Sequence, residues 1–450
     1  MAERLIRDRQ SLEQDEDRRL APYASRSSEG CRRHSAEGDQ AEDFRLAFQR
    51  DRDRILHSRA FRRLKHKTQV FVPHVGDHPR TRLTHTLEVA QLGRTIARVL
   101  GLNEDLVEAV ALGHDLGHTA FGHTGESTLN RILGGRDSVV CLPDPVLAEV
   151  GAFKHNYQSL RVVDLLERRY ARPGLNLTDQ VREGILKHTR WRVGFQFPLP
   201  DSAGLRLDSA CHLEGQAVAV ADEIAQQTHD LEDGLRNGSV QLEAVERLAV
   251  ARRVIHDLGE LYSGENRRWR RQDLLIRGLI RVLVGDVVET AAGRLQHVSN
   301  RRGLETREAW RLDRPRLSQT TVWFSRDTED LFGELKDFIY RFVINHPQVN
   351  RQDWRARKVV SALFFAFWSN PLTLPSYVLL RARDELGLPY LRDLPLAAVA
   401  DDVSRRYHTS AGFARLVVDH IAGMSDRFAL EEYASLEQPR PDQRFPGDLR

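Results

Sequence analysis

The sequence predicts an all-α protein. Apolar residues recur at helical spacing along most of the chain, and the alternation of apolar and polar residues that marks a strand is scarce. Residues typical of helix ends separate these patterns: Gly101 follows one of them and Asn103 precedes the next. With 450 residues the chain can bury a substantial core, in one large domain or in several small ones.

The expected elements begin after a polar N-terminal stretch. Residues 1–42 are polar and weakly periodic, and we expect a flexible arm there. Helical patterns then cover 44–64, 83–99 and the stretch from Asn103 to a loop rich in glycine and histidine, GHDLGHTAFGHTGE, at 113–126. Further helices are expected at 146–170, 178–188, 213–235, 241–262, 271–292, 328–345, 355–368, 375–384 and 410–434.

These patterns divide the chain into five segments. The flexible arm at 1–42 precedes a helical core at 43–235 and a helical insert or connector at 236–327. A C-terminal helical region at 328–436 and a polar tail at 437–450 complete the chain. No internal repeat is visible, which argues against a solenoid.

Composition excludes several classes of protein. The formal net charge of +3 is nearly balanced, so it does not by itself indicate nucleic-acid binding. The three cysteines, Cys31, Cys141 and Cys211, are widely spaced, which argues against a disulfide scaffold and favours a cytoplasmic protein. The longest apolar run, at 359–368, is too short to span a membrane, and the N-terminus lacks a secretory apolar segment. We therefore expect no membrane partner.

The loop at 113–126 carries the chemistry. His-Asp dipeptides occur three times, and HDLG occurs twice, so this motif alone is weak evidence for a site. The copy at His114 and Asp115 differs because two more histidines and a glutamate follow it within the loop. His85 precedes it in RTRLTHTLEVA, and Asp222 follows it within the apolar pattern AVAVADEIA. A carboxylate within such a pattern is costly unless it is paired or bound to a metal.

His85, His114, Asp115 and Asp222 are the candidate metal ligands. Two imidazoles and two carboxylates suit one divalent cation, and Mg, Mn, Fe, Co, Ni and Zn are all compatible with this set. Adjacent residues reach one ion only where the helix ends, and the glycines at 113 and 117 favour such an end. The alternative is that each is a polar residue satisfied at a helix end, although this order and the extra histidines favour a metal.

Longer segments resemble a known family. The resemblance is carried by the order H…HD…D and by five segments: RDRDRILHSRAFRRLKHKTQVF, LGHDLGHTAFGHTGE, FKHNYQSLRVV, EGILKHT and IAGMSDRFALE. These features are similar to those of bacterial dGTP triphosphohydrolases of the HD-domain superfamily, relatives of the vertebrate SAM-and-HD-domain dNTP hydrolase. The similarity runs from about residue 51 to about residue 433. It implies a helical HD core with an additional C-terminal helical region. It also implies metal-dependent attack at the α-phosphorus of a dNTP, which yields deoxynucleoside and inorganic triphosphate.

The resemblance assigns roles to further residues. His155 matches the family's general acid, and His123 and Glu126 match a further catalytic pair, whose i, i+3 spacing would let the carboxylate orient the imidazole. For substrate binding we select Arg82 and His118 at the phosphates, Gln69 and Asp230 at the sugar hydroxyl, and Tyr340 beneath the deoxyribose. Without the family, His155 could equally be a surface histidine and Tyr340 a core tyrosine.

Base preference and regulation stay open. On the helix at 213–235, Asp222, Gln226 and Asp230 form a polar stripe, but the family usually has tyrosine where this chain has Gln226. The family forms tetramers or hexamers, often with nucleotide activators, so we expect a homo-oligomer. A dNTP or a single-stranded nucleic acid could serve as effector.

Two other functions remain alternatives. Another HD-domain nucleotide phosphohydrolase or phosphodiesterase would share the four ligands, but it would not predict FKHNYQS or IAGMSDRFALE. A non-catalytic binder of dNTPs or of single-stranded nucleic acid could use the arginine-rich stretch at 45–82. The intact ligand set and His155 argue against such a loss of catalysis.

Overall fold

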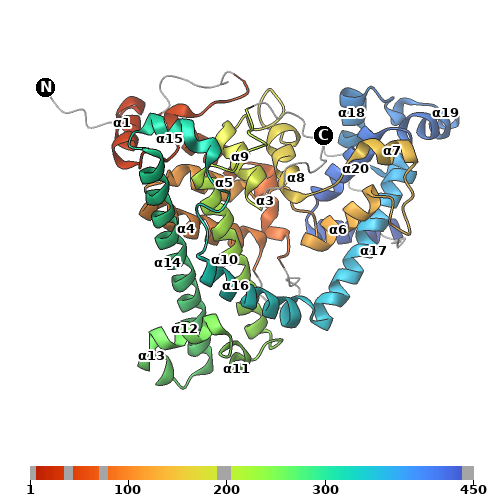
Figure 1. Ribbon diagram of the computed structural model, residues 1–450. Helices are drawn as coiled ribbons and strands as arrows, with labels where there is room; N and C mark the ends of the chain where they lie inside the picture. The colour runs from red at the N-terminus through yellow and green to blue at the C-terminus, as the bar shows by residue number, and fades with distance from the viewer. Residues whose placement is uncertain (1–6, 35–43, 70–79, 190–203, 438–450) are drawn as a thin grey trace.

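The structure is a computed structural model that describes residues 7–34, 44–69, 80–189 and 204–437. Within these residues the chain forms helices joined by turns, and the only β-pairings are two isolated bridges, Arg32 with Thr178 and Thr68 with Thr81. The predicted all-α class is therefore confirmed (Figure 1).

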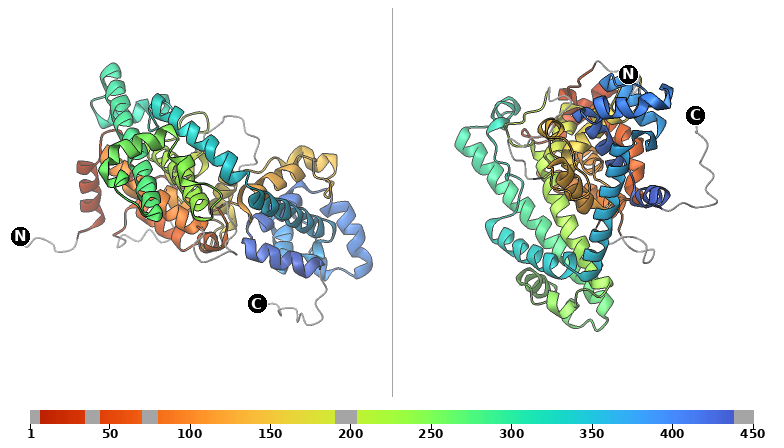
Figure 2. Two further views of the ribbon diagram at one scale, coloured as in Figure 1. Left: turned by 90° about the horizontal axis from the view of Figure 1, so that it is seen from below. Right: turned by 90° about the vertical axis from the view of Figure 1, so that its right-hand side faces the viewer.

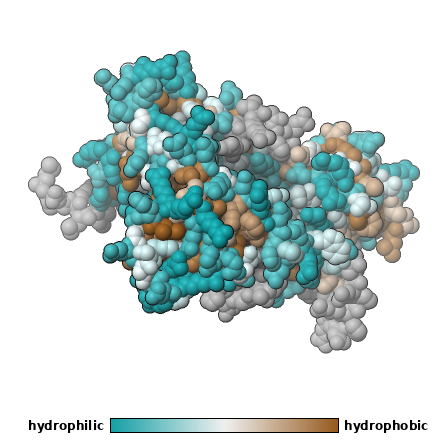
Figure 3. All heavy atoms as spheres, turned by 60° about the horizontal axis from the view of Figure 1, so that its bottom comes forward, coloured by the Kyte–Doolittle hydropathy of each residue, from teal (hydrophilic) through white to brown (hydrophobic). Residues whose placement is uncertain are grey.

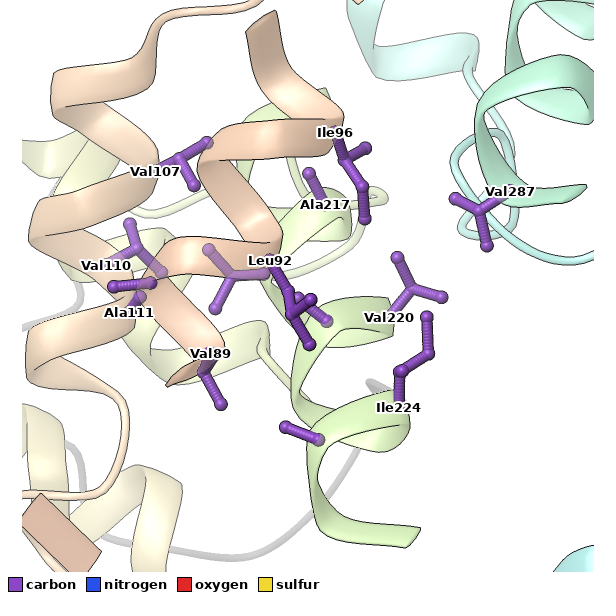
Figure 4. Close-up of a cluster of buried hydrophobic side chains, with 14 of the residues drawn as sticks. Val89, Leu92, Ile96, Val107, Val110, Ala111, Ala217, Val220, Ile224 and Val287 are labelled. Atoms are coloured by element: carbon purple, nitrogen blue, oxygen red, sulfur yellow. The ribbon is translucent and has the colours of Figure 1, made fainter. Parts of the chain in front are cut away.

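A first group of helices surrounds the loop that carries His114. Their apolar faces share one hydrophobic core, and Figure 4 shows side chains of three of these helices meeting in it, with Val287 approaching from a fourth. Caps predicted from the sequence delimit two of them: Gly101 has φ 67° after α4, and the side chain of Asn103 accepts from the amide of Leu106 in α5. The group comprises α2 (Ala47–Leu56), α3 (Arg59–Arg63), α4 (Arg82–Leu100), α5 (Glu104–Gly113), α8 (His155–Arg161), α9 (Asp179–Lys187) and α10 (Leu213–Arg236).

The connector region extends this first core. The long helix α14 packs against α10 and α4, α12 packs on α14, and α16 packs on α12 and α10 (Figures 1 and 2). The region comprises α11 (Leu242–Val245), α12 (Ala249–Leu258), α13 (Glu260–Ser263), α14 (Arg268–Arg302), α15 (Arg307–Asp313) and α16 (Arg326–Ile339). A π-helical segment, Tyr340–Ile344, follows α16.

A second hydrophobic core joins the C-terminal helices to two helices from the middle of the chain. Leu129, Ile132 and Phe153 pack with Phe364 and Phe367 in this core, and the left view of Figure 2 shows the two groups side by side. The members are α6 (Gly122–Leu133), α7 (Asp144–Val150), α17 (Pro347–Ser369), α18 (Ser376–Leu386), α19 (Leu396–Asp402), α20 (Ala411–Ala422) and α21 (Asp426–Glu437). Packing thus places α6 and α7 with the C-terminal region, although the sequence assigned them to the segment 43–235.

The expectation of a flexible arm at residues 1–42 is wrong for residues 7–34, the part that the structure describes. Helix α1 (Arg9–Arg19) forms there, and its Glu16 carboxylate accepts from the amide and hydroxyl of Ser27 and from Asn103. The amide of Ser25 donates to Glu214 at 2.7 Å. The polar composition suggested disorder, but these polar groups are buried. Their burial is tolerated because residues elsewhere in the chain satisfy their hydrogen bonds. Residues 1–6 and 35–42 lie outside the described residues.

Several expected helices are interrupted. The helix expected at 146–170 is divided into α7, α8 and a π-helical segment, Val162–Leu166, while the one expected at 410–434 breaks between α20 and α21. The helix expected at 271–292 is longer, because α14 runs from Arg268 to Arg302.

One face of the surface is mainly hydrophilic. Figure 3 shows this face, on which small apolar patches lie among hydrophilic residues. No helix among the described residues combines the length and the apolar character needed to cross a membrane.

Candidate active site

The loop after α5 is held against the start of α8. A Cβ atom on Gly117 would lie 2.1 Å from the amide nitrogen of Ser159 and 2.5 Å from the carbonyl oxygen of His155, so only glycine fits this close backbone approach. The hydroxyl of Ser159 donates to the His114 carbonyl at 2.7 Å and accepts from the Gly117 amide at 2.8 Å. These contacts bring the loop histidines next to His155 of α8.

The four predicted metal ligands come together from α4, the loop and α10. His85 Nε2 lies 2.9 Å from the Oδ1 atom of Asp222. His114 Nε2 lies 3.4 Å from Asp115 Oδ1 and 3.7 Å from Asp222 Oδ1. Ligand atoms of His85, His114 and Asp115 all lie within 4.8 Å of one another. The His114 and Asp115 side chains can both face one point because α5 ends at Gly113.

The donor set fits a divalent cation. The Nδ1 atom of His114 contacts the Ala111 carbonyl at 2.6 Å, which directs Nε2 toward the two carboxylates. That Nε2 atom is buried and makes no hydrogen bond. A buried polar atom without a partner is costly, and a metal ion bound by this nitrogen would remove the cost. His85, His114, Asp115 and Asp222 are thus arranged as the residues that could hold the metal.

The charges in this cluster support one another. Burial alone would lower the pKa of His114, but the carboxylates of Asp115 and Asp222 raise it to about 9. Burial would raise the pKa of Asp222, but its contacts with His114 and His85 hold it well below its usual range. The cluster therefore keeps Asp222 and Asp115 ionised, as metal binding requires, whereas His114 must release its proton to bind an ion.

His229 and Glu88 extend the cluster behind His85. The Nδ1 atoms of His85 and His229 lie 3.4 Å apart, and the Nε2 atom of His229 contacts the Glu88 carboxylate. Such partners orient a ligating imidazole. The sequence analysis missed this role, although His229 lies seven residues after Asp222 on the same helix and thus on the same face.

His155 forms a dyad with Glu126. The Glu126 carboxylate accepts from the backbone amide of His155 at 3.1 Å and contacts its Nδ1 atom at 2.8 Å. Burial would raise the pKa of Glu126, but the nearby His155 holds it at about 2. The hydrogen bond of Glu126 thus goes to His155 on α8 and not to His123, although the charge of His123 also helps to lower the pKa of Glu126. His123 instead lies edge-on to His118, with ring centroids 5.4 Å apart.

Two more histidines contact this dyad. The His118 ring stacks on His155 at a centroid distance of 3.9 Å, and its Nε2 atom lies 3.3 Å from Asp115 Oδ1. His188 Nε2 lies 3.2 Å from His155 Nε2, and burial, with the charges of His114 and His155, lowers the pKa of His188 to about 3. His188 had no assigned role in the sequence, although it lies in the matching segment EGILKHT.

A cavity reaches this group of residues. It has a volume of about 430 Å³, borders Asp222 and His188, and extends to Trp323. This volume is within the range of small-molecule sites. Of the four candidate metal ligands Asp222 lines the cavity, whereas His85, His114 and Asp115 are buried behind it.

The predicted substrate-binding residues have different surroundings. Arg82 is buried and donates to Asp115 Oδ2 at 2.7 Å, which leaves Oδ1 of that carboxylate facing the histidines. Asp230 on α10 is only 4 % exposed, whereas Tyr340 is 59 % exposed, which excludes the alternative of a core tyrosine. Gln69 is half-buried, and its carbonyl oxygen approaches Gly122 in the loop.

Asp230 makes the stability of the protein depend on pH. Burial, together with the charge of Asp233, raises its pKa to about 8. The folded state therefore retains a proton that the unfolded chain releases near pH 4, so Asp230 lowers stability progressively from about pH 4 to pH 8. We expect Asp230→Asn to stabilise the protein relative to wild type, by a margin that grows by roughly 1 kcal/mol for each pH unit between pH 5 and pH 7.

Chemical denaturation in a chelator at pH 5, 6.5 and 8 measures this difference. Asp401→Asn, at a carboxylate whose side chain is 59 % exposed, is the matched control and should show no such trend. A stability difference for Asp230→Asn that stays constant with pH would contradict the assignment.

Family comparisons agree with this arrangement. The HD domain model matches residues 82–227, which include all four candidate metal ligands. The phosphohydrolase-associated domain model matches residues 322–387 and 390–435.

Curated relatives align over almost the whole chain. The chain is 40% identical over 425 residues to a deoxyguanosinetriphosphate triphosphohydrolase-like protein of Cereibacter sphaeroides, an alignment that covers 93% of this chain and 99% of the relative. Proteins of the same name from Geobacter sulfurreducens and Thiobacillus denitrificans are 38% and 41% identical, and these alignments cover 93% and 92% of this chain and 95% and 96% of the relatives. The chain therefore belongs to the family of deoxyguanosinetriphosphate triphosphohydrolase-like proteins, which are HD-domain hydrolases.

Proposed function

We propose that the protein is a metal-dependent deoxynucleoside triphosphate triphosphohydrolase, which releases deoxynucleoside and inorganic triphosphate after attack at the α-phosphorus. One observation carries the proposal: the cluster of His85, His114, Asp115 and Asp222 lies directly beside the Glu126–His155 dyad. The names of the curated relatives add dGTP as a candidate substrate.

The four-residue cluster would hold one divalent metal. When bound, such an ion lowers the pKa of a coordinated water and neutralises phosphate charge. His85, His114, Asp115 and Asp222 supply its ligands in this proposal, and Arg82 fixes Asp115 so that Oδ1 stays available. The donor set does not select among Mg, Mn, Fe, Co, Ni and Zn.

The dyad supplies the proton for the leaving group. Glu126 holds Nδ1 of His155, so Nε2 is the atom that gives a proton to the 5′ oxygen as its bond to phosphorus breaks. The Glu126 anion stabilises the imidazolium before that transfer, in the way a carboxylate supports the histidine of a hydrolytic triad. His118 stacks on this ring and faces Asp115, a place from which it can contact the α-phosphate, while His123 lies at the edge of the group.

The sugar and phosphate contacts form a second part of the proposal. Arg82 and His118 would contact phosphate, Gln69 and Asp230 the 3′-hydroxyl, and Tyr340 the deoxyribose. With a pKa of about 8, Asp230 is mainly protonated at neutral pH and can donate a hydrogen bond to a hydroxyl oxygen.

Assembly, regulation and location follow from the resemblance and the sequence. We propose a cytoplasmic homo-oligomer, a tetramer or a hexamer, with a dNTP or single-stranded nucleic acid as its effector. The domain models support a catalytic segment at 43–235 and a C-terminal segment at 328–436, with 236–327 as their connector.

A product screen tests the function. The four dNTPs are supplied singly and mixed with each divalent metal in turn, and inorganic triphosphate, pyrophosphate and monophosphate are separated by ion chromatography. We expect metal-dependent release of intact triphosphate, and faster turnover in mixtures if an effector is needed. Release of pyrophosphate or monophosphate instead would identify another HD-domain phosphohydrolase, and binding without turnover under any metal would identify a non-catalytic binder.

A further inference from the structure

The loop that carries His118 ends in an unusual turn. Phe121 and Gly122 both have positive φ, 60° and 55°, and this conformation is unfavourable for phenylalanine. Strained residues persist where surrounding contacts hold them. The turn leads directly into α6, which presents His123 and Glu126, so its position affects both residues.

A carboxylate from the C-terminal helices holds this turn. Asp426, the first residue of α21, is buried, and its Oδ1 atom accepts from the Phe121 amide at 2.8 Å. Its Oδ2 atom accepts from the Thr68 amide at 2.9 Å and also from the Thr68 hydroxyl. One side chain therefore fixes the turn against Thr68, the neighbour of Gln69.

A lysine makes a parallel connection. The buried Lys67 Nζ atom donates to the carbonyl of His118 and, at 2.9 Å, to the carbonyl of Ala422 at the end of α20. The Lys67 carbonyl accepts from the Arg82 amide at 3.1 Å, which joins this segment to the start of α4. The C-terminal helices thus contact the loop directly at Phe121 and, through Lys67, at His118.

The opposite end of the loop is held differently. Ser159 on α8 binds the His114 carbonyl and the Gly117 amide. This contact adjoins the candidate metal ligands, whereas Asp426 and Lys67 act beyond Asp115. The loop therefore has two anchors: a metal-side anchor, Ser159, and a substrate-side anchor, Lys67 with Asp426.

We infer that Asp426 and Lys67 are positioning residues for substrate, through which the C-terminal helices set the placement of His118, His123 and Gln69 independently of metal binding. The inference rests on the proposed function for its catalytic part. It assigns the C-terminal region a direct part in the geometry of the site, beyond covering the apolar face of α6.

Two substitutions separate the anchors. Asp426→Asn leaves one oxygen to accept and removes the other acceptor, so either the Phe121 or the Thr68 amide loses its bond. We expect kcat/KM for the preferred dNTP to fall about 100-fold, since small displacements of catalytic groups cost this much, while Mn²⁺ affinity by calorimetry changes less than threefold. Ser159→Ala should instead weaken Mn²⁺ binding about tenfold, as for other residues that support metal ligands.

Asp286→Asn is the matched control. Its carboxylate also accepts one backbone amide, from Ser325 at 2.8 Å, and the hydroxyls of Ser325 and Thr328, at the start of α16. It should lose stability but retain kcat/KM at a temperature well below unfolding. Thr68→Val, which keeps the side-chain volume and loses one donor to Asp426, provides a milder variant with a fall in the same direction should Asp426→Asn fold poorly.

Hydrogen exchange tests the anchors without substrate. In metal-free protein, Asp426→Asn should speed exchange of the Thr68 or Phe121 amide at least about tenfold and leave the Gly117 amide unchanged, and Ser159→Ala should do the reverse. Equal losses of kcat/KM in Asp426→Asn and Asp286→Asn, or uniform acceleration of exchange, would overturn the inference. Absence of dNTP hydrolysis by the wild type would refute the proposed function, while the exchange pattern would still decide whether the two anchors exist.

Discussion

Replacing Asp222 with asparagine is expected to reduce triphosphate release on the order of 1000-fold and to abolish stoichiometric metal binding. Asp222 contacts His85 at 2.9 Å and lies 3.7 Å from His114, so it is the carboxylate that joins the ligand of α4 to the ligand of the loop. An amide at this position supplies a neutral oxygen and removes the charge that favours a cation. Metal content by mass spectrometry after dialysis, measured beside triphosphate release, checks both parts.

Glu223 offers a control on the same helix. It is the next residue along α10, lines the same cavity as Asp222, and forms a partly exposed ion pair with Lys336 at 2.7 Å. Among the described residues, its carboxylate forms no hydrogen bond or ion pair with His85 or His114, the imidazoles of the candidate metal ligands. Glu223→Gln should keep metal content and should alter turnover less than about twofold, because surface ion pairs contribute little. Full activity of Asp222→Asn with metal still bound would exclude the four-ligand site.

The second large effect is expected at the dyad. His155→Asn should lower kcat by 10²- to 10⁴-fold, the usual contribution of a general acid, while metal content stays at the wild-type value. Glu126→Gln should lower kcat by about 10²-fold, because the amide can still accept a hydrogen bond but lacks the charge that stabilises the imidazolium. Rapid-quench measurement of a single turnover separates this chemical step from product release.

Glu149→Gln on the exposed part of α7 is the control for the dyad variants. With a pKa of about 2, Glu126 stays ionised across the neutral range, so the charge that Glu126→Gln removes is present in the wild type at both pH 6 and pH 8. Unchanged single-turnover rates in both dyad variants would remove the general acid from the proposed mechanism.

The helical class could be predicted from the sequence because it depends on local patterns. Caps such as Asn103 mark helix ends, and the glycines around His114 allow two adjacent side chains to face one point. The grouping of His85 with Asp222 depends on how α4 packs against α10. It could be predicted because the order and the flanking segments of the four candidate ligands resemble those of a known family.

The partners of the catalytic side chains required that knowledge. The i, i+3 spacing of His123 and Glu126 indicates that the two lie close together on α6. The fold also brings His155 of α8 to the same carboxylate, and the hydrogen bond forms with His155. His188 and His229 likewise enter the site through the packing of α9 and α10. The polar composition of the N-terminal residues suggested disorder. The charge of Glu16 is evident in the sequence, but its hydrogen-bond partner Asn103 lies 87 positions away and is brought to it only by folding.

The shared hydrophobic core of α6 with the C-terminal helices limits how the protein can be divided. Cutting the chain before α17 would uncover Leu129, Ile132 and Phe153 to water, and the same cut would remove their partners Phe364 and Phe367. A fragment that retains every candidate metal ligand would therefore expose an apolar, aggregation-prone surface beside the loop at 113–126. For this enzyme the unit of expression, exchange or engineering is the two cores together.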